Sequence, residues 1–329
     1  MTLLNSQLPP LENRESHFSD LYSKYFLPIY ESAVKSQFKG VDGVNIDVRV
    51  LKNPNEIGSI VLLPGRTESH LKYAETIFDL YHSGFSIFTF DARGQGHSGR
   101  MLSNSEIGYV EHYDDYVADL HTFMTTIVEP QQGHNLYFLA HSMGAAIGAL
   151  YILKYQPPLR GVIFSSPLLH INLGNAPYPL IYAFIRAKCF LGLSKKFVQF
   201  PGNINVDTYG SDLTRSAARL TQYRSVLRIH PELRLGMPSN NWIRRSIEAT
   251  AFLQKDRNLK NIKYPLLLLE AGDDSVLDVT ANRSFEGFGS WMIKASFPGA
   301  FHDLFIERDD IRTKALRMMY LFMKETAAP

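Results

Sequence analysis

The sequence has 329 residues, of which 45% are hydrophobic, 20% are charged and only one is a cysteine. A chain of this length and hydrophobicity can bury a large core, either as two domains or as one domain with an inserted lobe. The single cysteine, Cys189, excludes an intrachain disulfide and is typical of a reducing compartment. The formal net charge is only +2, and we expect no nucleic-acid partner.

The N-terminal residues lack the pattern of a secretory signal, in which a basic region precedes an apolar one. No window of the sequence reaches the roughly 20 apolar residues that a spanning helix needs. The longest apolar stretch, 180–193, is interrupted by Arg186 and Lys188. We therefore expect a cytoplasmic protein that is soluble or peripheral to a membrane.

The predicted elements begin with an aromatic amphipathic segment at 15–38, which is interrupted at Pro28 and which we expect to pack on the core rather than on a membrane. Short runs of β-branched and aromatic residues then alternate with amphipathic segments of helical length. The expected strands are 45–51, 58–63, 85–90, 135–140, 161–165, 265–270 and 291–296, and the expected helices are 70–82, 113–128, 143–155 and 310–324. This alternation is typical of an α/β fold with a mainly parallel sheet flanked by helices.

The alternation stops after residue 169 and resumes near residue 262. In between, residues 170–250 hold eleven Lys or Arg and four Asp or Glu, a net charge of +7, whereas the rest of the chain is net −5. We predict that this stretch is a basic helical cap inserted over the strand ends. The predicted parts are thus an N-terminal extension (1–34), a first part of the core (35–169), the cap (170–250) and a second part of the core (251–329).

The charge of the cap favours an anionic partner, either a membrane surface or a phosphorylated substrate. The alternative is that the basic residues form an ordinary solvated helical face.

The segment FLAHSMGAAIG, residues 138–148, places Ser142 between an expected strand and an expected helix of small residues. This order matches the nucleophile elbow G-x-S-x-G, in which a sharp turn exposes the serine and small neighbours let the helix pack closely. Ala140 replaces the first glycine of the pattern. A pattern this loose also occurs by chance, so the rest of the chain must decide.

A serine becomes nucleophilic when a base takes its proton, and a third group must hold that base in the correct tautomer. In α/β hydrolases these groups follow strands in the chain order Ser, Asp or Glu, His. Here Ser142 follows the fourth expected strand, Asp273 and Asp274 follow the sixth, and His302 follows the seventh. The order predicts Ser142 as nucleophile and His302 as base, but either aspartate can orient the histidine.

Four other histidines fit the role of the base less well. His141 adjoins Ser142 on the proposed tight turn, where neighbouring side chains diverge. His112 and His121 lie in a helical pattern and His97 lies in a loop, so none of them follows a late strand.

Acyl transfer also needs donors for the oxyanion of the tetrahedral intermediate, each worth about 2.7–4 kcal/mol. We expect one donor to be the backbone N–H of Met143, the residue after the nucleophile. The second is expected in VLLPGRTESH, where the turn at Pro64 and Gly65 lets the N–H of Arg66 point inward. The side chain of Arg66 is incidental to this hole.

The segment GQGHSG, Gly94–Gly99, satisfies the dinucleotide pattern G-x-G-x-x-G, but no helical period follows it until about residue 113. A dinucleotide site needs these glycines to open a helix, so we interpret the segment as a loop. The sequence contains no P-loop, no H-E-x-x-H and no paired-cysteine metal motif. We expect no cofactor and no metal.

Six segments, LLPGRTES, DARGQGHSGR, HYDDYVADL, AHSMGAA, GMPSNNWIRRSI and GAFHDLFIE, resemble in order and spacing the bacterial lysophospholipase L2 family, which is itself similar to monoacylglycerol lipases. The resemblance extends from about residue 55 to 325. It implies an α/β-hydrolase fold and a serine hydrolase that cleaves the acyl ester of lysophospholipids, bound peripherally to the inner face of the cytoplasmic membrane. It also implies that Ser142, His302 and Asp274 form the catalytic triad, the aspartate being chosen by the pattern D-x-V-x-D at 274–278.

From the cap segment of this resemblance we expect Trp242 and Arg244 to contact the substrate. The sequence departs from the family pattern at Ala145, where a second glycine is common, and at Arg245, where a carboxylate can follow. These departures leave the head group of the substrate open. The alternative functions are a monoacylglycerol lipase or another carboxylesterase, and a non-catalytic binding protein on the same fold.

Overall fold

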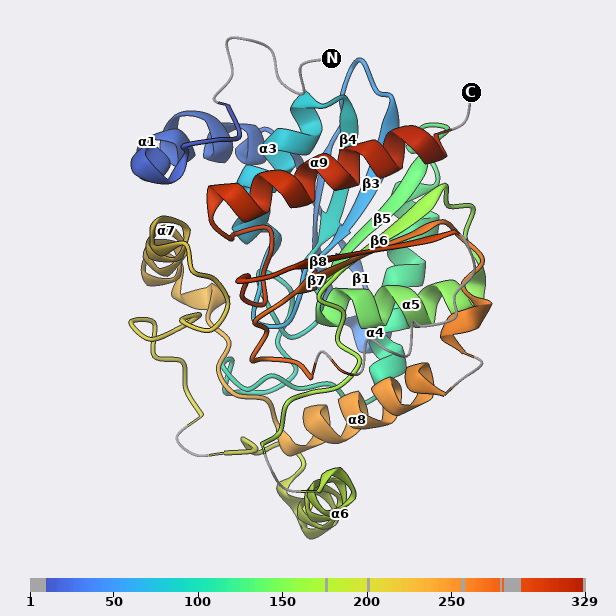
Figure 1. Cartoon of the computed structure of the whole chain (residues 1–329). Helices are drawn as coiled ribbons and strands as arrows, with labels where there is room; N and C mark the ends of the chain where they lie inside the picture. The colour runs from blue at the N-terminus through green and yellow to red at the C-terminus, as the bar shows by residue number, and fades with distance from the viewer. Residues whose placement is uncertain are drawn as a thin grey trace.

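The computed structural model describes residues 10–174, 177–199, 202–255, 258–278, 280 and 291–327. Its centre is an eight-stranded sheet in the order β1-β2-β4-β3-β5-β6-β7-β8, with helices on both faces (Figure 1). The strands are β1 (Val34–Lys39), β2 (Asn45–Leu51), β3 (Gly58–Leu63), β4 (Phe85–Phe90), β5 (Leu136–His141), β6 (Gly161–Ser165), β7 (Leu266–Ala271) and β8 (Met292–Phe297). The strand β2 is antiparallel to both of its neighbours, β1 and β4, and all other neighbouring strands are parallel.

The sheet is covered on both faces because successive strand residues alternate between two cores. The longer helices are α3 (Ala74–His82), α4 (Tyr113–Phe123), α5 (Met143–Tyr155), α8 (Asn240–Gln254) and α9 (Asp309–Thr326). In β3, Val61 and Leu63 join the core formed with helices α4, α5 and α8, whereas Ile60 and Leu62 join the core formed with α3 and α9. This arrangement confirms the predicted mainly parallel α/β fold.

All seven expected strands are present, and the three with shifted bounds begin and end one residue later than expected. The expected helix at 70–82 begins with a 3-10 turn at His70–Tyr73, and the one at 113–128 ends in a π-helix at Met124–Val128. The strand β1 was not expected. It lies at the edge of the sheet, and its side chains are exposed or half-buried, so its sequence lacks a buried run.

The N-terminal segment packs on the core, as predicted, because Phe18, Phe26 and Tyr30 are buried there. It forms α1 (Phe18–Leu21), a π-helix and α2 (Leu27–Glu31). The expected interruption at Pro28 is wrong. Pro28 lies in the first turn of α2, and the backbone stays helical from the π-helix at Tyr22–Phe26 into α2.

The predicted cap contains α6 (Tyr178–Lys188), which continues into a π-helix at Cys189–Leu193, α7 (Ala217–Ile229) and the start of α8. In Figure 1, α6 and α8 lie on the side of the molecule opposite to α9. The helix α8 runs through the predicted boundary at residue 250. The division of the chain into four parts stays a prediction.

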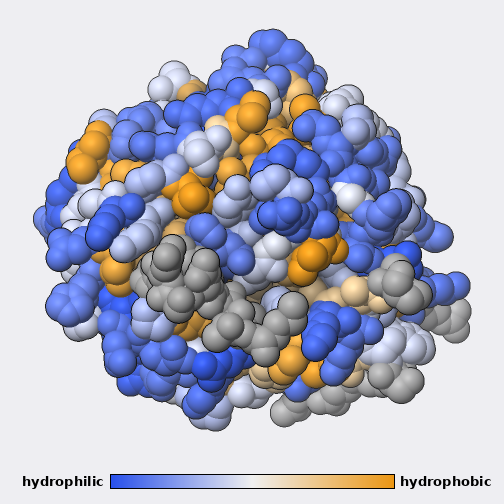
Figure 2. All heavy atoms as spheres, turned by 90° about the horizontal axis from the view of Figure 1, so that it is seen from above, coloured by the Kyte–Doolittle hydropathy of each residue, from blue (hydrophilic) through white to orange (hydrophobic). Residues whose placement is uncertain are grey.

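Figure 2 shows the molecule of Figure 1 from above. This surface is largely hydrophilic, with hydrophobic side chains in separate patches. Within the described ranges, no helix combines the length and apolar character that a membrane span requires.

A network of buried charges joins four distant segments of the chain. Glu75 in α3 binds Arg14 of the N-terminal segment at 3.0 Å and Arg219 of α7 at 2.8 Å. Asp79, one turn later, binds Arg14 and Arg312 of α9, each at 2.8 Å. The three arginine side chains are 1% exposed. Because a buried charge is costly without its partner, this network fixes how the N-terminal segment, α7 and α9 sit on α3.

Replacing Glu75 by alanine is expected to lower the free energy of unfolding by about 3–5 kcal/mol, because it leaves buried guanidinium groups without their carboxylate. Urea unfolding measures this loss. The control Glu12→Ala removes an exposed ion pair with Arg317 and is expected to cost less than about 1 kcal/mol. Equal losses for the two variants would contradict the role assigned to the network.

Candidate active site

Ser142 lies at the sharp turn between β5 and α5, with φ 50° and ψ −117°. Its carbonyl oxygen accepts the N–H of Leu168, and its own N–H donates to Ser165. A Cβ on Gly144 would lie 2.3 Å from the carbonyl oxygen of Leu63, far closer than two such atoms can approach. The small residues after Ser142 therefore let α5 begin directly against the end of β3, which is the geometry that the elbow pattern predicted.

The structure brings the three predicted triad residues together in one chain of hydrogen bonds. The Ser142 Oγ lies 3.0 Å from His302 Nε2, and His302 Nδ1 lies 2.7 Å from Asp274 Oδ2. The side chains of His302 and Asp274 are 3% and 2% exposed. This order of atoms is the one that transfers a proton from the serine to the histidine while the carboxylate fixes the tautomer.

The environment of Asp274 keeps its carboxylate ionised. Burial raises its pKa, but the hydrogen bond and charge of His302 and the backbone N–H groups of Leu277 and Val276 lower the pKa by more. These N–H groups donate to Oδ1 at 3.0 and 2.9 Å. The neighbouring Asp273 is exposed and instead pairs with Arg215 at 2.7 Å.

The two expected oxyanion donors lie on either side of the contact between β3 and α5. Met143 is the first residue of α5, where a backbone N–H has no acceptor within the helix. Arg66 lies in the loop after β3, next to Gly65, whose N–H donates to Glu68 Oε2 at 2.5 Å. The assignment of both N–H groups to an oxyanion hole stays a prediction.

A buried group of charges that the sequence reasoning missed supports this loop. Lys72 Nζ lies 2.5 Å from Glu68 Oε1 and 2.7 Å from Asp303 Oδ2, and the Tyr73 hydroxyl donates to Glu68 at 2.6 Å. Burial raises the pKa of Asp303, but the charges of Lys72, His141 and His302 together lower it by more, to about 2. Because Asp303 follows His302 in the chain, Lys72 connects the loop after β3 to the histidine. The only sequence signal was the spacing of Glu68 and Lys72, typical of an ion pair.

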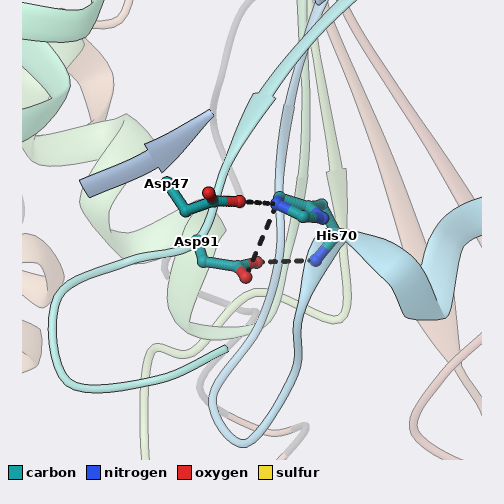
Figure 3. A group of neighbouring side chains, drawn as sticks. All are labelled: Asp47, His70 and Asp91. Atoms are coloured by element: carbon teal, nitrogen blue, oxygen red, sulfur yellow. Dashed lines mark hydrogen bonds and ion pairs between the residues drawn. The ribbon is translucent and has the colours of Figure 1, made fainter. Parts of the chain in front are cut away.

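The histidines that the sequence disfavoured as the base have other contacts. His141 is buried, its Nδ1 lies 3.2 Å from the Ser165 carbonyl oxygen, and burial lowers its pKa. The ring of His121 stacks on Tyr155. His97 stacks on His70 in the group shown in Figure 3, and His112 caps α4.

The predicted substrate residues Trp242 and Arg244 lie in α8. The Trp242 side chain is buried, and its Nε1 donates to the Tyr116 hydroxyl at 3.2 Å. Arg244 donates to Asn241 Oδ1 at 2.7 Å. Their contact with a substrate stays a prediction.

Among the residues that the structure describes, two groups of side chains have the composition of metal ligands: Asp47, His70 and Asp91, drawn in Figure 3, and Glu68, His141 and Asp303. In the first group His70 Nε2 is already 2.9 Å from Asp47, which also pairs with Arg49 at 2.7 Å. A guanidinium at this distance opposes a second cation, so we interpret this group as an anchor between β2, β4 and the start of α3. Lys72 has the same effect in the second group.

The glycine-rich loop at 94–99 also has a structural explanation. A Cβ on Gly96 would lie 2.0 Å from Asp91 Oδ2, and Gly94 has φ +81°. The next helix is α4, which begins only at Tyr113. The glycines thus form a tight turn around Asp91 rather than opening a helix, which confirms the interpretation as a loop.

Comparisons with known proteins place this geometry among serine hydrolases. The family model described as "Serine aminopeptidase, S33" matches residues 54–309. "Lysophospholipase L2" of Escherichia coli (strain K12) is 30% identical over 97% of this chain and 95% of its own length. "Probable lysophospholipase L2" of Haemophilus influenzae is 26% identical over 94% of this chain and 98% of its own.

Among solved structures, a soluble variant of monoglyceride lipase from Saccharomyces cerevisiae is 21% identical with a TM-score of 0.69, covering 89% of this chain and 96% of that chain. A thermostable carboxyl esterase from Bacillus coagulans is 15% identical with a TM-score of 0.73, covering 90% and 99%. At such low identity these two similarities support the fold alone.

The two adjacent aspartates make a matched pair for a test. Asp274→Asn is expected to lower kcat for an ester substrate by up to about 10⁴-fold, because the amide leaves the histidine in the wrong tautomer. Asp273→Asn is expected to cost far less, since it removes only an exposed ion pair with Arg215. Steady-state kinetics of both variants on one ester decides between them, and the reverse ranking would overturn the assignment of Asp274.

Proposed function

Because this chain belongs to the lysophospholipase L2 family and to the serine aminopeptidase S33 family, we propose that it is a carboxylic ester hydrolase acting on lysophospholipids. Its products are a free fatty acid and a glycerophosphodiester. The observation that carries the proposal is the continuous series of hydrogen bonds from Ser142 through His302 to Asp274. It occurs in a protein that matches an L2 relative along nearly its whole length.

In the first half of the proposed reaction, His302 Nε2 takes the proton of Ser142 Oγ while the oxygen attacks the ester carbonyl. The oxyanion accepts the backbone N–H groups of Arg66 and Met143. The intermediate then collapses: the bond between carbonyl carbon and glycerol oxygen breaks, and His302 gives its proton to the leaving oxygen.

In the second half, a water molecule loses a proton to His302 and attacks the acyl ester on Ser142. The fatty acid leaves when the bond to Ser142 Oγ breaks and His302 returns the proton to that oxygen. Asp274 carries its negative charge through both halves, since its depressed pKa keeps it ionised beside the positively charged imidazole.

Monoacylglycerols are the alternative substrates, because they carry the same acyl ester on glycerol without the phosphodiester. Relatives named "Monoacylglycerol lipase" and "Monoglyceride lipase homolog" are 22% and 23% identical to this chain. The higher identity and coverage of the L2 relative favour lysophospholipids as the main substrates.

A peripheral position at an anionic membrane on the cytoplasmic side is the second part of the proposal. The segment 178–193 carries exposed apolar side chains, among them Phe190 at 91% and Leu191 at 72% exposed. Exposed Arg186, Lys195 and Lys196 lie in or beside it. Apolar side chains flanked by cations fit the boundary between acyl chains and anionic head groups. Not all of the cap charge contributes, because Arg219 is buried against Glu75 and Asp309.

The substrate proposal predicts that the purified protein releases fatty acid from 1-acyl lysophospholipids and that Ser142→Ala abolishes this release. The fold should persist, because the turn already accommodates small residues. Fatty acid release is measured for several lysophospholipids and for monoacylglycerol of the same acyl chain.

Circular dichroism of the Ser142→Ala variant controls for folding, and a fluorophosphonate probe reports the nucleophile. Labelling of the wild type but not of the variant is expected. Appreciable activity in folded Ser142→Ala would contradict the role of Ser142. Hydrolysis of monoacylglycerol alone would contradict the substrate class, and an absence of labelling and activity would favour a binding protein.

The membrane proposal predicts that the protein sediments with phosphatidylglycerol vesicles and that binding weakens as salt rises, since each basic residue near such a surface contributes about 1 kcal/mol that salt screens. Lys195→Glu combined with Lys196→Glu should weaken binding, and so should Phe190→Ser.

The matched control is Lys24→Glu combined with Lys35→Glu, which makes the same charge change at exposed positions of the N-terminal region. It should leave vesicle binding nearly unchanged. Equal binding to neutral phosphatidylcholine vesicles, or an equal effect of both charge reversals, would argue against a specific basic surface.

A further inference from the structure

The side chain of Arg66 is held at a fixed place between the core and the cap. Its Nη2 donates to the carbonyl oxygen of Gly236 at 2.5 Å, and its Cζ lies 5.0 Å from the centroid of the Trp242 ring. A cation over the face of a tryptophan is held by the charge distribution of the ring. Trp242 is in turn fixed by its hydrogen bond to Tyr116.

This guanidinium has no anionic partner among the residues that the structure describes. Its Nε is buried without a hydrogen-bond partner. Burial lowers the pKa of Arg66 to about 10, and the neighbours that raise it are the tyrosines Tyr116 and Tyr209 rather than carboxylates. The contrast with Arg14, Arg219 and Arg312 is clear, because each of these buried arginines binds a carboxylate.

An arginine without a carboxylate is costly in such a place, since desolvating a charge without pairing it destabilises the protein. The arrangement is favourable when an anion with several acceptor oxygens completes it. A guanidinium offers a rigid fork of donors that fits the oxygens of a phosphate, so phosphate is the anion best matched to this side chain.

The position of Arg66 relates this anion to the reacting ester. Its backbone lies beside Gly65 and Pro64, and the carbonyl oxygen of Pro64 would be 2.6 Å from a Cβ on Gly144, two residues after Ser142. The side chain then extends from the proposed oxyanion donor to the cap. In a 1-acyl lysophospholipid the phosphate is likewise separated from the ester by the three carbons of the glycerol.

We propose that Arg66 binds the phosphodiester of the substrate head group and so determines the preference for lysophospholipids over neutral monoacylglycerols. This inference rests on the proposed function and deepens it. Arg66 then has two separate contacts, with its backbone N–H on the oxyanion and its side chain on the phosphate. Trp242 acts as a positioning residue that holds the guanidinium over its ring.

Arg66→Gln tests the proposal because it keeps the backbone N–H and removes the charge. The substrates are 1-oleoyl lysophosphatidylethanolamine and 1-oleoylglycerol, which share the acyl chain and the glycerol ester. We expect kcat/KM for the lysophospholipid to fall about 10- to 100-fold, as for the loss of a charged hydrogen-bonded pair. For 1-oleoylglycerol the change should be less than about threefold, a value within the usual scatter of side-chain truncation effects. Arg228→Gln, which removes an exposed cap charge paired with Asp207, should change neither value.

Gly108→Ala gives a second variant that leaves residue 66 intact. A Cβ at this position would lie 2.7 Å from Arg66 Nη2 and 3.3 Å from Nε, so the guanidinium must shift. We expect the same selective loss of kcat/KM for the lysophospholipid, but of smaller magnitude than in Arg66→Gln. This variant keeps the proposal testable if Arg66→Gln fails to fold.

A soluble probe separates this proposal from the proposed function. Glycerol 3-phosphate should inhibit hydrolysis of p-nitrophenyl butyrate by the wild type more strongly than glycerol does, and Arg66→Gln should remove that difference. Inorganic phosphate is tested as a further inhibitor. The head-group role is overturned if inorganic phosphate inhibits as strongly as glycerol 3-phosphate and if Arg66→Gln lowers the activity on both oleoyl substrates equally.

Equal losses on both oleoyl substrates, in Arg66→Gln and in Gly108→Ala, mean that Arg66 only fastens the cap to the core and overturn the proposal. A wild type that cleaves 1-oleoylglycerol but no lysophospholipid overturns the proposed function instead. The two failures are distinct because the first is read in the variants and the second in the wild type.

Discussion

The contact between the start of α5 and the end of β3 is the constraint on which the rest of the site depends. Gly144 packs so closely on the carbonyl groups of Leu63 and Pro64 that no side chain fits between them. Ser142, two residues earlier, has a positive φ that non-glycine residues rarely adopt. The close packing of Gly144 also brings the loop that carries Arg66 next to the helix that begins at Met143. One close contact thus lies beside the proposed nucleophile and both proposed oxyanion donors, and backbone strain of this kind persists only where the surrounding structure holds it.

Buried charges restrict the movement of the loop after β3, which carries Arg66. Glu68 binds the N–H of Gly65 and the ammonium of Lys72, and Lys72 binds Asp303 beside the histidine. Buried ion pairs add little net stability, but breaking one is expensive, so their partners must keep their places. The position of the loop is therefore fixed relative to that of His302. The group of Asp47, His70 and Asp91 anchors the far end of the same loop.

The parts of this structure that could be predicted from the sequence are those determined by local patterns. Buried β-branched runs such as 58–63 identify their strands, because both faces of a parallel strand are covered. Chain order placed Ser142 and His302 correctly beside each other because parallel strands end at one edge of the sheet. The choice between Asp273 and Asp274 needed the resemblance to a family, since the strand alternation ends at Gly272 before either residue. The pairing of Arg66 with the cap could not be predicted, because its partner Gly236 lies 170 residues away.

The hydrogen bond between Arg66 and Gly236 connects the cap directly to the loop of the proposed oxyanion hole. A cap that only covered the strand ends would influence the reaction by excluding water and by shaping the acyl site. Here the loop of the proposed oxyanion hole reaches into the cap at two points, because Thr67 Oγ1 also lies 3.1 Å from the Tyr209 hydroxyl. The cap residues Gly236 and Tyr209 therefore contact this short loop on one side, while Glu68 binds it on the core side. Occupation of the site between them by a phosphate would favour the arrangement in which the Arg66 N–H faces the ester, so that recognition of the head group and stabilisation of the oxyanion reinforce each other.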